Sequence, residues 1–165
     1  MSAPATPAIA LVQRHGIAHA VHPYELPDSH GRARAERPDY GVEAAAALGR
    51  PPGEVGKTLV ALVDGRPAVA VIPVDRQLDL KAFAAAVGGR HATLADPASA
   101  ERAAGSVVGG ISPLAMRRPL PTVVDATLAA LPAVCVSAGR RGLQLELAGS
   151  DLVTLSQAAV AAIAR

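Results

Sequence analysis

Apolar residues along this chain occur in short runs with two different spacings, and glycine, proline and polar residues separate the runs. Apolar residues that return every three or four positions are typical of helices, whereas alternating or continuous apolar runs bounded by turn residues are typical of strands. The pattern predicts helices over residues 6–16, 42–48, 80–87 and 97–105 and from residue 150, and strands over residues 17–24, 57–63, 67–73, 122–125, 133–137 and 143–147.

Capping residues indicate where three of these helices begin. Thr6 and Asp96 each precede a proline, which is the usual order of an N-cap and a first helical residue. Ser150 would cap a final helix whose apolar residues lie near one face: Leu152, Leu155, Val160 and Ile163.

The connections between the runs predict the domain organisation. An Asp64-Gly65 turn joins two runs rich in valine and leucine, which predicts a hairpin. Residues 25–39 are rich in Pro, Asp, Ser, His, Gly and Arg, and they predict a polar, mobile loop rather than a linker between domains. With strands joined partly by hairpins and partly by helices, the 165 residues predict a single mixed α/β domain over residues 1–165.

The composition limits the kinds of partner and compartment. Half of the residues are apolar, but the chain has one Phe, two Tyr and no Trp. The core must therefore be aliphatic, and aromatic platforms that stack bases are not expected. Cys135 is the single cysteine, which excludes an internal disulfide and favours a reducing, cytoplasmic setting. We find no targeting segment and no apolar run long enough to span a membrane, so no membrane partner is expected.

The charge is weakly basic, with a net charge of +2 at neutral pH. This balance permits an RNA partner without requiring one. Lys57 and Lys81 are the only lysines among 16 basic residues, and the others are arginines. Because a basic position in this chain is usually arginine, each lysine is more informative than it would be elsewhere.

The most informative feature is the glycine-rich loop at residues 108–114, Val-Gly-Gly-Ile-Ser-Pro-Leu, together with Lys57 at the start of an apolar strand. Two adjacent glycines expose backbone N–H and C=O groups to a ligand, and Pro113 restricts the end of the loop. The loop and the lysine predict a backbone-lined pocket with one ammonium, suited to a polar, anionic or ester-bearing ligand. Two simpler interpretations stay open: the glycines can form only a tight turn, and Lys57 can be a surface or salt-bridged lysine.

Groups for covalent or metal catalysis are not evident. Ser112 lies outside a Gly-x-Ser-x-Gly elbow and precedes proline, and Cys135 lies in an apolar strand, where cysteine is usually a small core residue. Asp125 ends a strand and fits either a ligand contact or a helix cap. Three histidines approach metal-ligand spacing, but glycine and proline interrupt the segment, so we expect no metal there: His15, His19 and His22.

Two arginine pairs are candidates for phosphate contacts. Arg117-Arg118 and Arg140-Arg141 each lie beside a glycine-containing loop. They could bind tRNA phosphates, or they could be solvated surface charge.

Motifs spread over nearly the whole chain resemble the YbaK family of free-standing Cys-tRNA(Pro) deacylases, which are related to the editing domain of bacterial prolyl-tRNA synthetase. The motifs that carry the resemblance are Thr6-Pro7-Ala8, His22-Pro23-Tyr24-Glu25, Lys57-Thr58-Leu59, Gln77-Leu78-Asp79-Leu80-Lys81, Ala95-Asp96-Pro97, the glycine-rich loop, Leu120-Pro121-Thr122 and Arg141-Gly142-Leu143.

The resemblance implies a mixed α/β fold around a largely antiparallel, barrel-like sheet flanked by helices. It implies that Lys57 orients the terminal adenosine and the ester, and that the backbones of Gly109, Gly110 and Ile111 contact the ester carbonyl and the aminoacyl group. Pro113 would keep the loop rigid. The other residues that we expect to contact the substrate are Tyr24, Thr58, Ser112, Asp125, Ser137, Gly139 and Gln144.

The activity that the resemblance implies is hydrolysis of mischarged tRNA(Pro), with Cys-tRNA(Pro) as the leading substrate and no cofactor. Either a water positioned by the tRNA ribose hydroxyl or the thiol of the cysteinyl group would attack the ester. Backbone donors to the developing oxyanion would supply much of the rate. Prolyl-tRNA synthetase is a candidate second partner, and DNA is not expected to bind.

Several alternatives stay open. The substrate could be Ala-tRNA(Pro) or another small aminoacyl-tRNA, or the chain could bind an aminoacyl-tRNA or a synthetase without catalysis. A regulator that binds a nucleotide through the glycine-rich loop is a third class. Three positions depart from the family pattern: Gln144 replaces a common carboxylate, Ala115 replaces a common glycine, and the loop at residues 25–39 is longer than usual.

Overall fold

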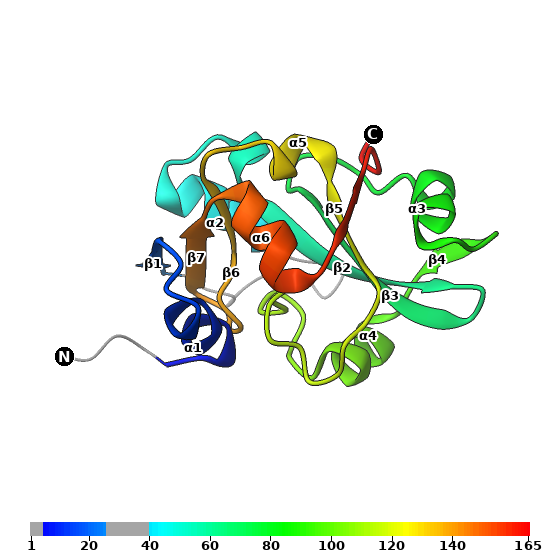
Figure 1. Ribbon diagram of the computed structural model, residues 1–165, viewed down its shortest axis with the longest axis horizontal. Coiled ribbons are helices and arrows are strands. Elements are labelled where there is room, and N and C mark those ends of the chain that lie inside the picture. The colour runs from blue at the N-terminus through cyan, green and yellow to red at the C-terminus, as the bar shows by residue number, and fades with distance from the viewer. Residues whose placement is uncertain (1–4, 26–39) are drawn as a thin grey trace, which may run out of the picture.

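The computed structural model describes residues 5–25 and 40–165, and it has the mixed α/β architecture that the sequence predicts (Figure 1). The predicted mobile loop falls almost entirely outside the described residues. The helices are α1 (Pro7–Arg14), α2 (Tyr40–Leu48), α3 (Leu80–Val87), α4 (Pro97–Ala104), α5 (Ala126–Ala129) and α6 (Gly149–Ser156), with a short 3-10 turn η1 (Pro52–Glu54). The strands are β1 (His19–Pro23), β2 (Gly56–Val63), β3 (Arg66–Pro73), β4 (Ala92–Leu94), β5 (Thr122–Asp125), β6 (Val134–Ser137), β7 (Leu143–Leu147) and β8 (Ala159–Ala161).

The described strands form two sheets, whereas the family resemblance implied one largely antiparallel, barrel-like sheet. A three-stranded antiparallel sheet has the order β1-β7-β6, and a five-stranded sheet has the order β4-β2-β3-β5-β8. In the larger sheet, β2 pairs with β3 as the predicted hairpin, while β5 pairs with β3 and β8 pairs with β5 in parallel. The three-stranded sheet lies at one end of the molecule beside α1 and α2, and the tip of the hairpin lies at the other end beside α3 and β4 (Figure 1).

Local hydrogen bonds explain the starts of the helices. The Thr6 hydroxyl accepts a hydrogen bond from the amide of Ile9, and the Asp96 carboxylate accepts one from Ser99, as expected of the two predicted N-caps. Asp79 caps α3 in the same way through the amide of Ala82. These caps are encoded within four residues of sequence.

The C-terminal segment differs from its prediction. Helix α6 begins after Ala148 rather than Ser150, and it ends at Ser156, where Gln157 takes a left-handed conformation. The chain then continues as β8, which contains Val160, and places Ile163 in the core. Pairing with β5 and hydrogen bonds to the Asp125 carboxylate hold this segment extended, so it does not continue as the predicted helix.

The two sheets meet where β2 begins. Val55, just before β2, forms a parallel bridge with Cys135 of β6. A Cβ on Gly56 would lie within 3.3 Å of side-chain atoms of Leu128, Val71 and Val136, so the glycine allows a close approach here. This junction brings the first residues of β2 next to the end of β6 and the start of β7.

None of the helices in the described part of the chain has the length and hydrophobicity of a membrane-spanning helix.

Candidate active site

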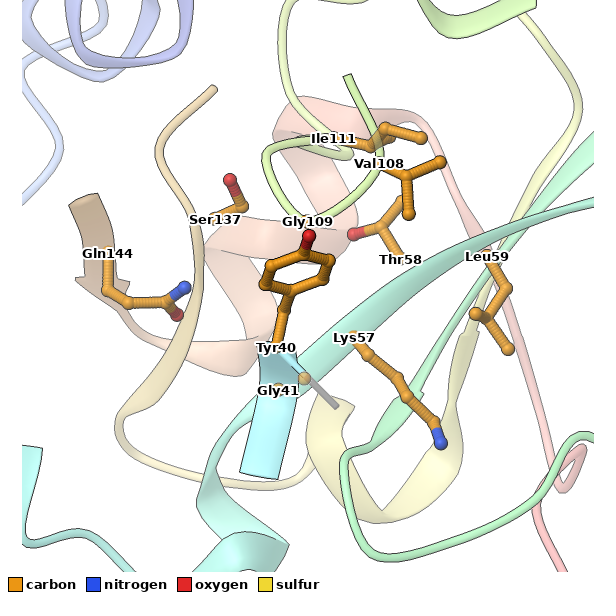
Figure 2. A pocket seen from close by; sticks show the side chains of 11 residues that line it. Tyr40, Gly41, Lys57, Thr58, Leu59, Val108, Gly109, Ile111, Ser137 and Gln144 are labelled. Atoms are coloured by element: carbon orange, nitrogen blue, oxygen red, sulfur yellow. The ribbon is translucent and has the colours of Figure 1, made fainter. Parts of the chain in front are cut away.

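A cavity of about 360 Å³ lies at the junction of the sheets, and it brings Lys57 together with the glycine-rich loop (Figure 2). The two features are separated by about 50 residues in sequence. Strand β2 contributes Gly56, Lys57, Thr58 and Leu59, the loop contributes Val108, Gly109 and Ile111, and the three-stranded sheet contributes Ser137 and Gln144. Tyr40 and Gly41 at the start of α2 complete the lining.

Lys57 supplies the charge of this cavity. It is half-buried and is the one charged residue among the described residues that line the cavity. No described carboxylate forms an ion pair with it. In Figure 2 its side chain extends away from Gly109, so the ammonium and the glycine-rich loop mark different sides of the cavity. This arrangement suits a ligand with an anionic or hydroxyl-rich part near Lys57 and a carbonyl near the loop.

The two glycines of the loop are required by close packing. Gly109 has φ +90°, and a Cβ on it would lie 2.7 Å from Cδ2 of Tyr40. A Cβ on Gly110 would lie 2.8 Å from the backbone nitrogen of Arg141 and 2.9 Å from the backbone of Arg140. The loop is therefore held between the Tyr40 ring and the turn between β6 and β7.

The backbone amides of the loop differ in their availability. The amide of Gly110 donates to the carbonyl of Val107 at 2.9 Å, and Gly110 does not line the cavity. Its expected contact with the ester is therefore not available through this amide. Gly109 and Ile111 do line the cavity, and no acceptor among the described residues pairs with their amides. Two amides beside a cavity that have no acceptor among the described residues are suited to stabilising negative charge on a carbonyl oxygen.

Two buried polar atoms on the cavity wall have no partner among the described residues. These atoms are Oγ1 of Thr58 and Oε1 of Gln144. Ser137, which pairs with Gln144 across β6 and β7, uses its hydroxyl to accept a hydrogen bond from the amide of Gly139 at 3.2 Å. A buried polar atom without a partner is costly, so Thr58 and Gln144 indicate a site that a polar ligand completes.

Several residues that the sequence assigned to the substrate do not line this cavity. Tyr24 uses its backbone amide to pair with Gly142, and Ser112 is buried with its hydroxyl accepting from the amide of Leu114. Pro113 lines a different cavity beside Leu155. Gly139 lies in the turn after β6, near Thr6.

Asp125 has a structural role that the sequence left open. Its carboxylate caps α5 through Thr127 and also accepts from the amides of Ile163 at 2.9 Å and Ala164 at 3.1 Å. Burial alone would raise the pKa of Asp125, but these hydrogen bonds outweigh burial and hold the pKa below its usual value. The residue is 3% exposed and does not line the cavity with Lys57. The structure therefore supports the capping interpretation.

All four candidate arginines are exposed. Arg117 lies beside Gly105, where a Cβ on the glycine would be 2.8 Å from the Cβ of the arginine. Arg141 makes two contacts with other parts of the protein. Its Nε donates to the carbonyl of Val108 at 2.7 Å, and its guanidinium lies 4.6 Å from the centre of the Tyr40 ring.

No described cysteine or histidine lines the cavity. Cys135 is fully buried in β6, and burial raises the pKa of its thiol, which keeps it neutral. Over residues 5–25 and 40–165, no group of three histidine, cysteine or carboxylate side chains could hold a metal ion. His22 instead lies 3.6 Å from the carboxylate of Glu146, which also pairs with Arg50.

Tyr40, which supports the loop and lines the cavity, was not predicted from the sequence. The predicted polar loop ends at residue 39 and the predicted helix begins at residue 42, so Tyr40 lies between them. Two signals were present: Tyr40 is one of only two tyrosines, and it precedes a glycine at the start of a helix. A Cβ on Gly41 would lie 2.5 Å from Cγ1 of Val74, so this glycine lets α2 approach the larger sheet closely.

Comparison with known proteins identifies the family that has this fold and cavity. A family model described as the aminoacyl-tRNA editing domain matches residues 38–155. The chain therefore belongs to the aminoacyl-tRNA editing domain family, a family of hydrolases, which confirms the resemblance noted in the sequence.

Two proteins of similar sequence and one of similar structure have names that refer to aminoacyl-tRNA editing or deacylation. The chain is 31% identical over 159 residues to EbsC of Enterococcus faecalis, described as a candidate Cys-tRNA(Pro)/Cys-tRNA(Cys) deacylase, with 96% of this chain and 92% of that protein covered. It is 35% identical over 80 residues to the multifunctional Ser/Thr-tRNA deacylase ProXp-y of Escherichia coli, with 46% and 48% covered. The crystal structure of a candidate trans-editing enzyme for prolyl-tRNA synthetase shares the fold, with a TM-score of 0.74 and 24% identity over 98% of this chain and 99% of that one.

Proposed function

We propose that this protein removes the amino acid from mischarged tRNA(Pro), with Cys-tRNA(Pro) as its main substrate. The observation that carries the proposal is the cavity lined by Lys57, Gly109 and Ile111, in which the amides of the last two have no acceptor among the described residues. The terminal adenosine and its ester would lie between them, with the ammonium on the nucleotide side and the amides at the ester carbonyl. The similarity to EbsC over nearly the whole chain supports cysteine as the acyl group.

The reaction needs no nucleophile from the protein. In one route, a water oxygen attacks the ester carbonyl, the bond to the ribose oxygen breaks, and that oxygen takes a proton. The products are cysteine and a tRNA with a free terminal hydroxyl. In the other route, the cysteinyl sulfur bonds to the carbonyl carbon, the bond from that carbon to the ribose oxygen breaks, and the thiol proton passes to the ribose oxygen. The products are a thiolactone and a tRNA with a free terminal hydroxyl. Both routes develop negative charge on the carbonyl oxygen, where the amides of Gly109 and Ile111 would stabilise it.

A second group of substrates is favoured by the unpartnered atoms of the cavity. Thr58 Oγ1 and Gln144 Oε1 could bind the hydroxyl of a seryl or threonyl group, and a hydroxyl is a stronger hydrogen-bond donor than a thiol. The partial match to a Ser/Thr-tRNA deacylase supports this alternative. Prolyl-tRNA synthetase remains a candidate partner, supported by the fold shared with the trans-editing neighbour.

A panel of aminoacylated tRNA(Pro) tests the proposal. Cysteinyl, alanyl, seryl and prolyl esters are incubated with the protein, and the loss of each ester is followed with time. We expect fast loss of the cysteinyl ester, slower loss of the other two mischarged esters and no loss of the prolyl ester. Saturable binding of the charged tRNA without ester loss above background would instead identify a binding module. Mass spectrometry of the released cysteine or thiolactone distinguishes the two routes.

A further inference from the structure

Val108, the residue before Gly109, is held by two charged side chains, one from the preceding helix α4 and one from the turn between β6 and β7. The amide of Val108 donates to Oε1 of Glu101 in α4 at 3.0 Å, and the carbonyl of Val108 accepts from Nε of Arg141 at 2.7 Å. Both polar groups of one loop residue are therefore fixed, one from each side. A hydrogen bond from the Gly110 amide to the Val107 carbonyl, at 2.9 Å, is a third restraint on the loop.

Arg141 is suited to this task by its shape. Its guanidinium lies over the Tyr40 ring at 4.6 Å while its Nε donates to the loop. Tyr40 in turn lies against Gly109 (Figure 2). A planar guanidinium can stack on a ring and donate from its edge at the same time, whereas a lysine ammonium cannot do both in this geometry.

We propose that Glu101 and Arg141 are positioning residues that hold the glycine-rich loop so that the amides of Gly109 and Ile111 face the cavity. This inference rests on the proposed function, because it assigns those amides to the ester carbonyl. It gives Arg141 a role besides the expected contact with a tRNA phosphate, since Nε and the face of the guanidinium are used by Val108 and Tyr40. Preorganised donors lose no free energy to reorientation during the reaction, so a loosened loop lowers kcat more than it raises KM.

The test compares Arg141→Lys, Glu101→Ala and Glu101→Gln with the wild type and with Arg66→Lys, a control at an exposed arginine of the hairpin. The substrates are Cys-tRNA(Pro) and the cysteinyl ester of adenosine, which lacks the tRNA phosphates. We expect Arg141→Lys and Glu101→Ala to lower kcat about tenfold on both substrates, with KM for the adenosine ester changed less than about twofold. Glu101→Gln keeps an acceptor for the Val108 amide and should restore most of the activity, and Arg66→Lys should match the wild type.

Hydrogen exchange of the Gly110 amide, measured by NMR, tests the positioning without any reaction. We expect faster exchange in Arg141→Lys and Glu101→Ala and unchanged exchange in the other two variants. Unchanged Gly110 exchange in all four variants would overturn the inference. An Arg141→Lys variant that raises KM for the tRNA alone and hydrolyses the adenosine ester normally would also overturn it, since that result identifies a phosphate contact. A wild type that cleaves neither ester would reject the proposed function, while the exchange data would still decide whether these residues hold the loop.

Discussion

The Tyr40 ring lies directly against the backbone of Gly109, so close that a Cβ on this glycine would be 2.7 Å from Cδ2 and 2.8 Å from Cγ of the ring. The two residues are separated by almost seventy positions in the chain. Their contact fixes the glycine-rich loop beside the cavity and explains why the loop has no side chain at this position.

Gly109→Ala should therefore disrupt the loop. The substitution adds the clash with Tyr40 to the strain of a positive φ, which alone costs roughly 1–3 kcal/mol. We expect kcat/KM for the cysteinyl ester to fall at least about tenfold. Gly65→Ala is the matched control, because Gly65 has a φ of +82° but no atom within 4 Å of an added Cβ. Equal loss of activity in the two variants would show that the Tyr40 contact does not matter.

Thr58→Val should separate stability from function. The valine has nearly the same shape and removes a buried hydroxyl that has no partner among the described residues, so the free energy of unfolding should stay the same or rise by up to about 1 kcal/mol. If the hydroxyl binds the substrate, kcat/KM should fall by roughly tenfold, which is about 1.4 kcal/mol. Urea unfolding and deacylation assays measure the two effects. A stabilised variant with full activity would remove Thr58 from the site.

Asp125→Asn should change the stability of the protein and its dependence on acid. The folded pKa of Asp125 lies below the unfolded value, so the ionised carboxylate stabilises the fold above about pH 4. That contribution is lost as the pH falls through the folded pKa. We expect the variant to be less stable at pH 7 by roughly 1–3 kcal/mol, with the difference from the wild type shrinking as the pH falls below about 4. Urea titrations at several pH values measure this, and a difference that does not depend on pH would contradict it.

Cys135→Ala should leave the deacylation rate unchanged. The thiol is fully buried in β6, its pKa is raised by burial, and it does not line the cavity. The substitution should cost about 1 kcal/mol of stability, the scale of one buried methylene group. In the wild type, an alkylating reagent should modify Cys135 slowly in buffer and rapidly in urea. Fast alkylation of the folded protein, with loss of activity, would reveal a reactive thiol.

Features encoded by neighbouring residues were predictable from the sequence. Thr6 and Asp96 cap helices through bonds that reach three residues along the chain, and the turn at residues 64–65 joins β2 and β3 as expected. The glycine-rich loop and Lys57 were correctly chosen as neighbours, because a scarce lysine and a double glycine stand out against the rest of the composition.

Features that depend on distant contacts were not predictable in the same way. The segment after α6 has helical spacing of apolar residues, yet it pairs with β5 and bonds to Asp125 from nearly forty residues away. The sequence does not reveal that Arg141 also contacts Val108 and Tyr40, and its predicted phosphate contact stays a prediction. The availability of each loop amide likewise depends on partners elsewhere in the fold.

The most direct test of the central claim is the single-turnover rate of cysteine release from Cys-tRNA(Pro) by the wild type, by Lys57→Met and by Lys81→Met, the exposed second lysine that serves as the control. If the cavity between Lys57 and the glycine-rich loop cleaves the ester, the wild type and Lys81→Met should release cysteine at the same rate, well above the uncatalysed rate. Lys57→Met should then be slower by at least roughly tenfold. Release at the wild-type rate by Lys57→Met, or no release above background by the wild type, would contradict the account.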